Sequence, residues 1–162
     1  MPKAWDIWQM RLYIDTSVFG ALFDQEPAKR VEQSEMFFTR AKSRLDSLFI
    51  SDVVLDEIAQ APQHLRSSLE KVISQVRPMV LAESSETLEL AEAYVAACVV
   101  PRRFRDDARH VVVASVAAVD ALVSWNFKHL VNLQRKRLVH SVNVRLGYPM
   151  IDLVSPEEAL YE

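Results

Sequence analysis

The 162-residue sequence predicts a single α/β domain built on a mainly parallel sheet. Short apolar runs typical of buried strands alternate along the chain with longer segments whose apolar residues recur at helical spacing. Prolines fall between these segments, where they are tolerated, and so help to define the ends of the elements. The composition is 50% hydrophobic and 25% charged, which is typical of a globular domain and excludes extensive disorder.

The first half of the chain is expected to alternate two short strands with helices. The apolar run 12–14 ends at Asp15, after which Thr16 or Ser17 is a favourable helix cap. The segment that begins at residue 28 places apolar and charged residues at helical spacing. The elements predicted in this half are a strand over 11–14, helices over 16–22 and 28–46, a strand over 48–51, and helices over 52–59 and 63–76.

The second half continues the alternation. Glu86, Glu89 and Glu92 mark the solvent side of one amphipathic helix. The sequence Ser-Pro-Glu-Glu from Ser155 is a typical helix start. The elements predicted in this half are a strand over 77–81, helices over 86–99 and 105–119, a strand over 121–124, a helix over 127–133, a strand over 151–154, and a helix that starts at 155.

Simple counts exclude several classes of protein. Two glycines are too few for a Gly-rich phosphate-binding loop. The single cysteine, Cys98, excludes an intramolecular disulfide and a Cys-rich zinc site, which fits a reducing compartment. Without a long apolar window or a secretory signal, we expect a cytoplasmic protein with no membrane span. Residues 1–9 precede the first strand and are interpreted either as an extension of a domain over 10–162 or as the result of a misassigned start before Met10.

Acidic residues adjoin several of the predicted strands. Asp15 closes the first strand, the pair Asp56 and Glu57 lies in the helix after the second, and Asp106 and Asp107 begin the helix before the strand at 121–124. Because the carboxyl ends of parallel strands meet at one edge of a sheet, we expect these acids to converge. The last of these helices is almost wholly apolar, so it should be buried with its acidic end near the centre of the protein.

Each polar residue in this region also has a simple structural interpretation. Asp15 is a favourable helix N-cap, and an acid such as Asp107 suits the first turn of a helix, where the dipole favours negative charge. His110 lines the same region, although a lone histidine is more often a hydrogen-bonding residue of the core. Asp120 either stops a helix or assists the site. Asn126 offers a neutral oxygen ligand or an amide that positions a water, or it caps a loop.

Convergent carboxylates favour a metal site. They repel one another and raise some of each other's pKa values, and a hard divalent cation relieves this repulsion. Mg²⁺ and Mn²⁺ prefer oxygen ligands of this kind. Such a cluster suits phosphodiester hydrolysis, because the cation binds a phosphate oxygen, lowers the pKa of an attacking water and stabilises the leaving group.

Four segments share their order and spacing with a known family. They are Tyr-Ile-Asp-Thr-Ser (13–17), Ser-Asp-Val-Val-Leu-Asp-Glu-Ile (51–58), Asp-Ala-Arg-His-Val-Val-Val-Ala (107–114) and Val-Asp-Ala-Leu-Val-Ser-Trp-Asn-Phe-Lys-His-Leu (119–130). Together they resemble PIN-domain ribonucleases, and in particular the VapC-like toxins of bacterial type II toxin–antitoxin pairs. The resemblance covers about residues 11–160 and rests on the set of motifs, since no single motif is specific.

This resemblance implies a three-layer α/β/α sandwich and Mg²⁺- or Mn²⁺-dependent endonuclease activity on single-stranded regions of RNA. It makes Asp15, Glu57 and Asp107 the metal ligands or water-positioning groups of the site. Many members carry a further aspartate at the fourth position, where this chain has Asn126. The catalytic set implied by the resemblance is therefore these three acids with Asn126.

Four further residues are candidates for supporting roles in the site. Thr16 and Ser17 adjoin the first acid, while His110 and Asp120 adjoin the others. The resemblance also implies two protein partners, a second copy of the chain in a homodimer and a cognate antitoxin. The helix over 28–46 has apolar residues on more than one side, which fits such an interface or an ordinary core.

Cations flank the acids and are candidates for RNA binding. Arg102, Arg103 and Arg105 lie just before the helix of Asp107, and Lys128 follows the late strand. They fit contacts to phosphates around an acidic centre, or a solvated basic face. Trp125 either stacks on an unpaired base or packs in the core. The net charge of −3 argues against a generally basic nucleic-acid-coating protein, but it allows such a local basic rim.

Two other functions remain open at this point. A PIN-fold protein without the fourth acid can bind RNA or a protein without cutting, and metal affinity would separate this case from a nuclease. A phospho-acceptor signalling domain also carries acids at strand ends. That class needs acids clustered before the first helix and a lysine after a late strand, whereas this chain offers Asp15 alone and places Trp125 and Asn126 first after the late strand.

Overall fold

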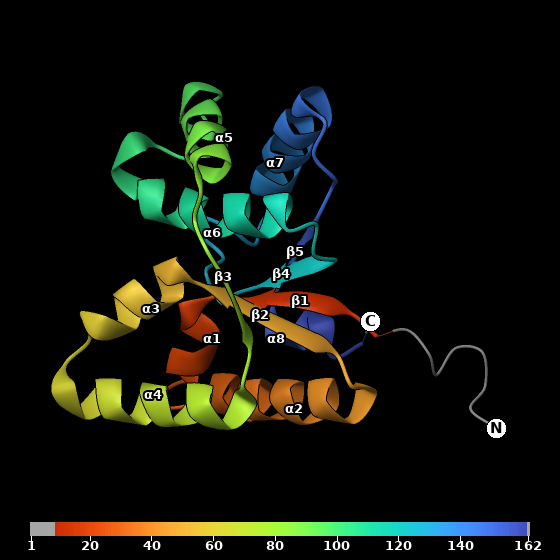
Figure 1. Cartoon of the computed structure of the whole chain (residues 1–162). Helices are drawn as coiled ribbons and strands as arrows, with labels where there is room; N and C mark the ends of the chain where they lie inside the picture. The colour runs from red at the N-terminus through yellow and green to blue at the C-terminus, as the bar shows by residue number, and fades with distance from the viewer. Residues whose placement is uncertain (1–8, 162) are drawn as a thin grey trace.

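The computed structural model describes residues 9–161, and its centre is a five-stranded sheet in the order β3-β2-β1-β4-β5 (Figure 1). All of the paired strands run parallel. The predicted α/β class with a parallel sheet is therefore confirmed. The strands are β1 (Arg11–Ile14), β2 (Ser47–Ser51), β3 (Met79–Leu81), β4 (Ala121–Val123) and β5 (Asp152–Val154).

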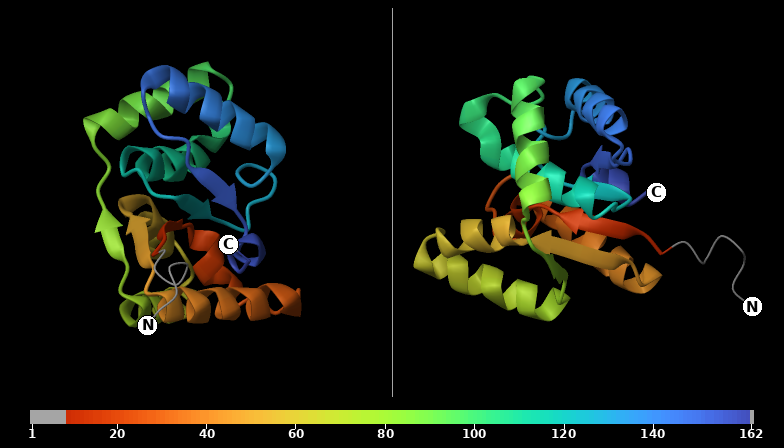
Figure 2. Two further views of the ribbon diagram at one scale, coloured as in Figure 1. Left: turned by 90° about the vertical axis from the view of Figure 1, so that its right-hand side faces the viewer. Right: turned by 45° about the horizontal axis from the view of Figure 1, so that its top comes forward.

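Helices cover both faces of this sheet and complete a three-layer α/β/α sandwich. Helices α5, α6 and α7 lie on one face, and α2, α4 and α8 lie on the other (Figure 1, Figure 2). The helices are α1 (Thr16–Ala21), α2 (Ala28–Arg44), α3 (Asp52–Ala59), α4 (Gln63–Val76), α5 (Ser85–Ala96), α6 (Arg105–Val116), α7 (Leu133–Leu146) and α8 (Pro156–Ala159). A short 3₁₀ helix, Arg102–Phe104, leads into α6.

Strand β1 lies at the middle of the sheet and aligns the ends of its neighbours. Tyr13 lies beside Phe49 of β2 on one side and beside Leu122 of β4 on the other. Tyr13 and Ile14 are completely buried, as expected for a central strand with helices on both faces. Because these strands are parallel and in register, the residues that follow them emerge together at one edge of the sheet.

Helix α6 is buried along most of its length, as its apolar sequence predicts. Its buried residues include His110, and they extend through Val111–Ser115. The apolar side chains pack between the sheet and α5, so the amino end of α6 reaches the edge at which β1 and β4 end. This packing brings the first turn of α6, with Asp107, to the centre of the molecule.

The structure corrects the helix predicted over 127–133. Residues 127–130 form turns, and α7 begins only at Leu133. The Asn132 side chain caps α7 by accepting a hydrogen bond from the Arg135 N–H at 2.9 Å. Gly147 ends the helix with a φ of 81°, a conformation that favours glycine. These two residues are the local signals for a helix that the sequence analysis did not identify.

The described chain is anchored from its first strand onward. The Met10 N–H donates a hydrogen bond to Asp46 Oδ1 at 2.9 Å, and the Ser47 N–H donates one to the Met10 carbonyl at 2.8 Å. The extension expected over residues 1–9 lies outside the described residues except for Gln9. Among the described helices, none combines the length and the apolar character needed to cross a membrane.

Candidate metal centre

The predicted acids meet where β1, β2 and β4 end. Asp15 follows β1 directly, Glu57 lies on α3 after β2, and Asp107 lies in the first turn of α6. Three ligand atoms, one each from Asp15, Glu57 and His110, lie within 4.8 Å of one another. The third member of this group is a histidine from α6, so the structure moves His110 from the periphery of the predicted site to its middle.

Asp15 is held in place by two hydroxyl groups. Its Oδ2 accepts a hydrogen bond from Ser17 Oγ at 2.7 Å and another from Ser124 Oγ at 2.6 Å. The carboxylate is only 5% exposed, and its Oδ1 lies 3.3 Å from Nε2 of His110. Asp15 occupies the N-cap position of α1 but makes no side-chain cap hydrogen bond, so its oxygens are directed into the cluster and not into the helix.

His110 connects the two acids to the core. Its Nε2 forms a short hydrogen bond with Glu57 Oε1, and its Nδ1 lies 2.8 Å from the Tyr13 hydroxyl. That hydroxyl lies 2.6 Å from Ser51 Oγ at the end of β2. The imidazole is therefore fixed on both of its ring nitrogens, which is the arrangement that orients a metal-ligating or acid-bridging histidine.

The charges around His110 determine its protonation. Burial disfavours the imidazolium, but Asp15 and Glu57 outweigh burial, and together with Asp107 they raise the pKa of His110 above its ordinary value. Burial also raises the pKa of Tyr13 well above its usual value, so this hydroxyl keeps its proton. The bonded chain from Glu57 through His110 and Tyr13 to Ser51 is thus a polar network that is buried at His110, Tyr13 and Ser51 and reaches solvent at Glu57.

Asp107 lies beside this group but is not part of the tight three-atom cluster. Burial raises its pKa, and Asp15 and Glu57 raise it further, while His129 and His110 act in the opposite direction. Its Oδ1 lies 3.5 Å from Nδ2 of Asn126. The Asp107 carboxylate is therefore repelled by the negative charges of Asp15 and Glu57, and a bound cation would relieve this repulsion.

Asn126 caps a loop, which is one of the roles considered for it from the sequence. Its Oδ1 caps the following turn by accepting a hydrogen bond from the His129 N–H at 2.9 Å. Its amide nitrogen is the atom that contacts Asp107. The oxygen is therefore engaged in the turn, and a hydrogen-bond donor faces the acid. The role of Asn126 as an oxygen ligand stays a prediction.

The donor set fits a divalent cation. Asp15 and Glu57 supply carboxylate oxygens, which are the ligands that Mg²⁺ and Mn²⁺ prefer, whereas Nε2 of His110 contacts both carboxylates and orients them. Thr16 Oγ1, directly after Asp15, is buried and has no hydrogen-bond partner among residues 9–161. A buried polar atom without a partner beside convergent acids is a position that a ligand or a water can satisfy.

Asp120 does not belong to this site, contrary to the expectation that it assists. It precedes β4, so it lies at the opposite edge of the sheet, where its Oδ2 accepts a hydrogen bond from the Arg11 N–H at 2.7 Å. Arg11 begins β1, whereas Asp15 follows the end of that strand. A residue before a parallel strand and a residue after its neighbour lie a strand length apart, and this separates Asp120 from the cluster.

The neighbouring acids Asp56 and Asp106 are directed toward Arg109. The guanidinium lies 3.5 Å from Asp56, 3.2 Å from Asp106 and 2.5 Å from Glu83. The hydrogen bond from Arg109 lowers the pKa of Glu83, and the same contact raises the pKa of Arg109. Arg109 thus ties α6 to α3 and to the segment after β3, and its role is structural.

The cations predicted to bind RNA differ in the contacts that their side chains make within the protein. Arg105 forms an ion pair with Glu92 at 2.6 Å, and Arg103 lies over the Phe104 ring at 4.9 Å. Arg102 and Lys128 are exposed on segments adjoining the amino end of α6 and the end of β4. Trp125, by contrast, is 6% exposed, and its Nε1 donates to Ser34 Oγ at 2.9 Å, so the structure favours packing over base stacking for this residue.

Two residues of this region, Ser124 and Tyr13, were not expected from the sequence. Ser124 donates to Asp15 from the end of β4, and Tyr13 contacts His110 from within β1. Ser124 was detectable, since it directly follows the apolar run of a strand adjacent to β1. Tyr13 was not, because nothing in a strand sequence shows which buried side chain a helix will meet.

Comparisons with known proteins support the fold. The chain matches no protein-family model and has no significant match among curated proteins. Its structure is similar to a chain in the crystal structure of VapBC2 from Rickettsia felis bound to a DNA fragment from their promoter, with a TM-score of 0.54 and 15% sequence identity. The match covers 90% of this chain and 98% of that chain, so the likeness extends over the whole domain.

The fold is therefore that of a PIN-like α/β/α sandwich, and the expected architecture is confirmed. At 15% identity the likeness concerns the fold alone. The chemistry of this chain rests on its own residues, which are an acidic and histidine-containing cluster at the carboxyl edge of the sheet.

Proposed function

We propose that this protein is a divalent-metal-dependent endoribonuclease that hydrolyses phosphodiester bonds in single-stranded regions of RNA, and that it acts as the toxin of a toxin–antitoxin pair. The observation that carries the proposal is the grouping of Asp15, Glu57 and His110 at the carboxyl edge of a PIN-like sheet. Asp107 lies beside this group; its pKa is raised by burial and further by the negative charges of Asp15 and Glu57, and a bound cation would counter this effect.

In this proposal Asp15, Glu57 and Asp107 hold Mg²⁺ or Mn²⁺. The chemistry that such a cation supplies is polarisation of a phosphate oxygen and a lowered pKa for an attacking water. Ser17 and Ser124 fix the carboxylate of Asp15, so its geometry is set before substrate binds. His110 orients Glu57 and Asp15 through Nε2 and is a positioning residue.

The substrate and partners follow from the surroundings of the site. Arg102, Arg103 and Lys128 are exposed cations on segments adjoining the amino end of α6 and the end of β4, and they would contact phosphates. The antitoxin is proposed from the likeness to a chain of the VapBC2 complex, and a second copy of the chain is proposed from the sequence resemblance to VapC-like toxins. Met36 on α2 is 50% exposed and is a candidate contact, whereas Phe37 is buried in the core.

The test is cleavage of a mixed RNA pool with Mg²⁺, Mn²⁺ or EDTA. We expect metal-dependent cutting by the wild type and a loss of at least about 100-fold in Asp107→Asn. Asp106→Asn is the matched control, because Asp106 is adjacent, contacts Arg109 and has a side chain that is 79% exposed. Equal turnover by a folded Asp107→Asn protein would refute the assigned site.

A second candidate function is RNA or protein binding without cleavage. It is favoured by Asn126, which presents an amide donor to Asp107 where an acid would complete the cluster. This candidate predicts that RNA binds in EDTA as tightly as with Mn²⁺ and that no cutting is seen in either condition. Asn126→Asp separates the two cases, since a nuclease should gain activity with a fourth carboxylate, and a binding module built on the amide should not.

A further inference from the structure

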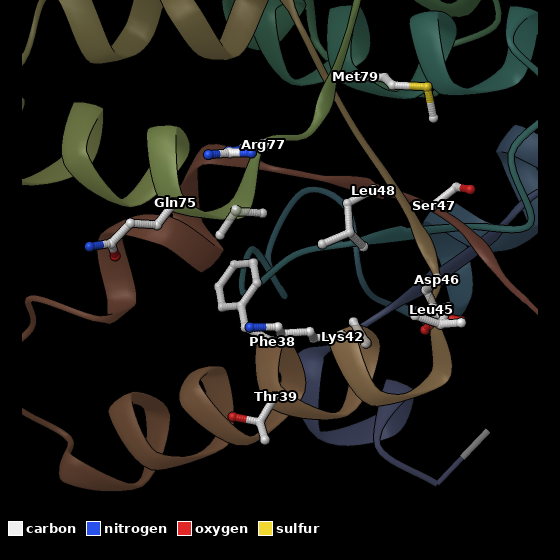
Figure 3. Close-up of a pocket in the computed structure, with 12 residues that line it drawn as sticks. Phe38, Thr39, Lys42, Leu45, Asp46, Ser47, Leu48, Gln75, Arg77 and Met79 are labelled. Carbon is white, nitrogen blue, oxygen red and sulfur yellow. The ribbon is translucent and has the colours of Figure 1, made fainter.

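A groove of about 590 Å³ lies on the face of the sheet covered by α2 and α4 (Figure 3). Phe38 of α2 and Leu48 of β2 point into it, Val76 at the end of α4 contributes to its wall, and Met79 of β3 lies at its border. Its size is within the range of sites that bind small ligands or a few side chains. It is far from the candidate metal centre, because it adjoins the residues at which β2 begins, and the centre lies where β2 ends.

The apolar surface of this groove is open to solvent. Met79 is 51% exposed, and Leu45, at the end of α2, is 70% exposed. Two cations, Lys42 and Arg77, also line the groove and are exposed. A ligand that combines large apolar side chains with a negative charge would therefore complement it.

The amino terminus of the chain enters the fold at the rim of this groove. Asp46 and Ser47 both line the groove, and both bind the backbone of Met10, at 2.9 Å and 2.8 Å. The residues before Met10 are therefore tethered beside the groove. The segment before Met10 therefore has a high effective concentration at the groove.

The composition of residues 1–9 complements the groove. Trp5, Ile7 and Trp8 provide three large apolar side chains, and Asp6 lies among them with a negative charge. An extended chain spans about 3.4 Å per residue, so the chain before Met10 has a reach of about 7 Å at position 8 and about 17 Å at position 5. Adjacent strands are about 4.8 Å apart, which places β3, the far wall of the groove, about 10 Å from β1. Both tryptophans can therefore reach the groove.

We propose that this groove is the binding site of the chain's own N-terminal segment, with Trp5 and Trp8 packed against Phe38, Leu48 and Met79, and Asp6 beside Lys42 and Arg77. A tether of a few residues gives the segment a high effective concentration at the groove and avoids the entropy cost of association. Binding would also cover one end of the edge strand β3, a part of a sheet that proteins commonly protect. The inference does not depend on the nuclease activity.

The test measures how well the two tryptophans are shielded in the full chain. The chain has three tryptophans, so Trp125→Phe leaves only Trp5 and Trp8 as emitters. We expect acrylamide quenching of this protein to be about threefold weaker than in a version that also carries Met79→Glu in the groove. Met36→Glu is the matched control, since Met36 is 50% exposed on α2 but does not line the groove. Equally strong quenching in all three proteins overturns the proposal.

A second measurement keeps the proposal testable if Trp125→Phe does not fold. Amide hydrogen exchange is compared between the natural sequence and a chain that starts at Met10. We expect slower exchange at 38–48 and 75–81 in the full chain, and identical exchange overturns the proposal. Protection that disappears on dilution would assign the groove to the segment of a second copy and overturn the intramolecular assignment.

Discussion

Aspartates lie at both edges of the parallel sheet: Asp46, Asp120 and Asp152 where strands begin, and Asp15 and Asp107 on the side where they end. At the first edge each carboxylate contacts a donor. Asp46 forms an ion pair with Arg44 at 2.7 Å, Asp120 accepts a hydrogen bond from a backbone N–H at 2.7 Å, and Asp152 lies 3.5 Å from the Lys136 ammonium.

The second edge is organised differently, because its acids face one another. Asp15 and Glu57 meet at a single histidine, and Asp107 experiences the charge of both. The position of an aspartate near a strand end thus does not show by itself whether it belongs to a metal site. The partners of the carboxylate distinguish an acid that stabilises the fold from an acid that remains available to a cation.

The largest expected difference between the edges is in metal affinity. We expect Asp15→Asn to lower the affinity for Mn²⁺ by at least about 100-fold, because it removes a carboxylate from the cluster and leaves the shape unchanged. Asp120→Asn, at the other edge, should bind Mn²⁺ like the wild type. Calorimetric titration of Mn²⁺ into the three proteins measures this, and equal loss in both variants would remove the distinction between the edges.

A smaller difference concerns the pH dependence of stability without metal. The pKa of His110 is raised in the fold by Asp15 and Glu57 despite burial, so its contribution to stability is fully present below the unfolded value, near 6.5. This contribution is lost as the pH rises through the higher folded pKa. Urea unfolding in EDTA between about pH 5 and pH 9 should show this decline in the wild type.

The control variants for this dependence come from the same chain. His110→Gln should largely lose the decline, because the titrating imidazole is gone. His64→Gln should keep it, since His64 is exposed on α4. A decline of equal size in His110→Gln would mean that other groups determine the pH dependence.

The sequence was sufficient for the fold and for part of the cluster. The alternation of strands and helices predicted the parallel sheet, and the rule for carboxyl ends predicted that Asp15 and Glu57 would meet. The same rule, applied strictly, places Asp120 at the opposite edge, because it precedes its strand. The expectation that Asp120 assists the site was therefore wrong, and the position of Asp120 before its strand was already visible in the sequence.

Other features depend on contacts between distant segments. The central position of His110 requires α6 to pack with one face toward both Tyr13 and Glu57, which the helical pattern alone does not determine. The ion pair between Arg109 and Glu83 joins residues 26 positions apart. The groove at the amino edge is formed by two helices and two strands, and no local pattern predicts such a cavity.

The smallest effect expected is the loss of the Asp120 carboxylate as the acceptor of a backbone N–H. Asp120→Ala removes the partner of the Arg11 N–H at the start of the central strand, and we expect it to lower the free energy of unfolding by about 0.5–1.5 kcal/mol. Asp120→Asn retains an acceptor oxygen and should recover most of this loss. Urea denaturation compares the variants, with RNA cleavage as a second readout that should not change. Reduced cleavage by a folded Asp120→Ala protein would mean that the amino edge of the sheet contributes to the chemistry, and the separation of the two edges by function would then fail.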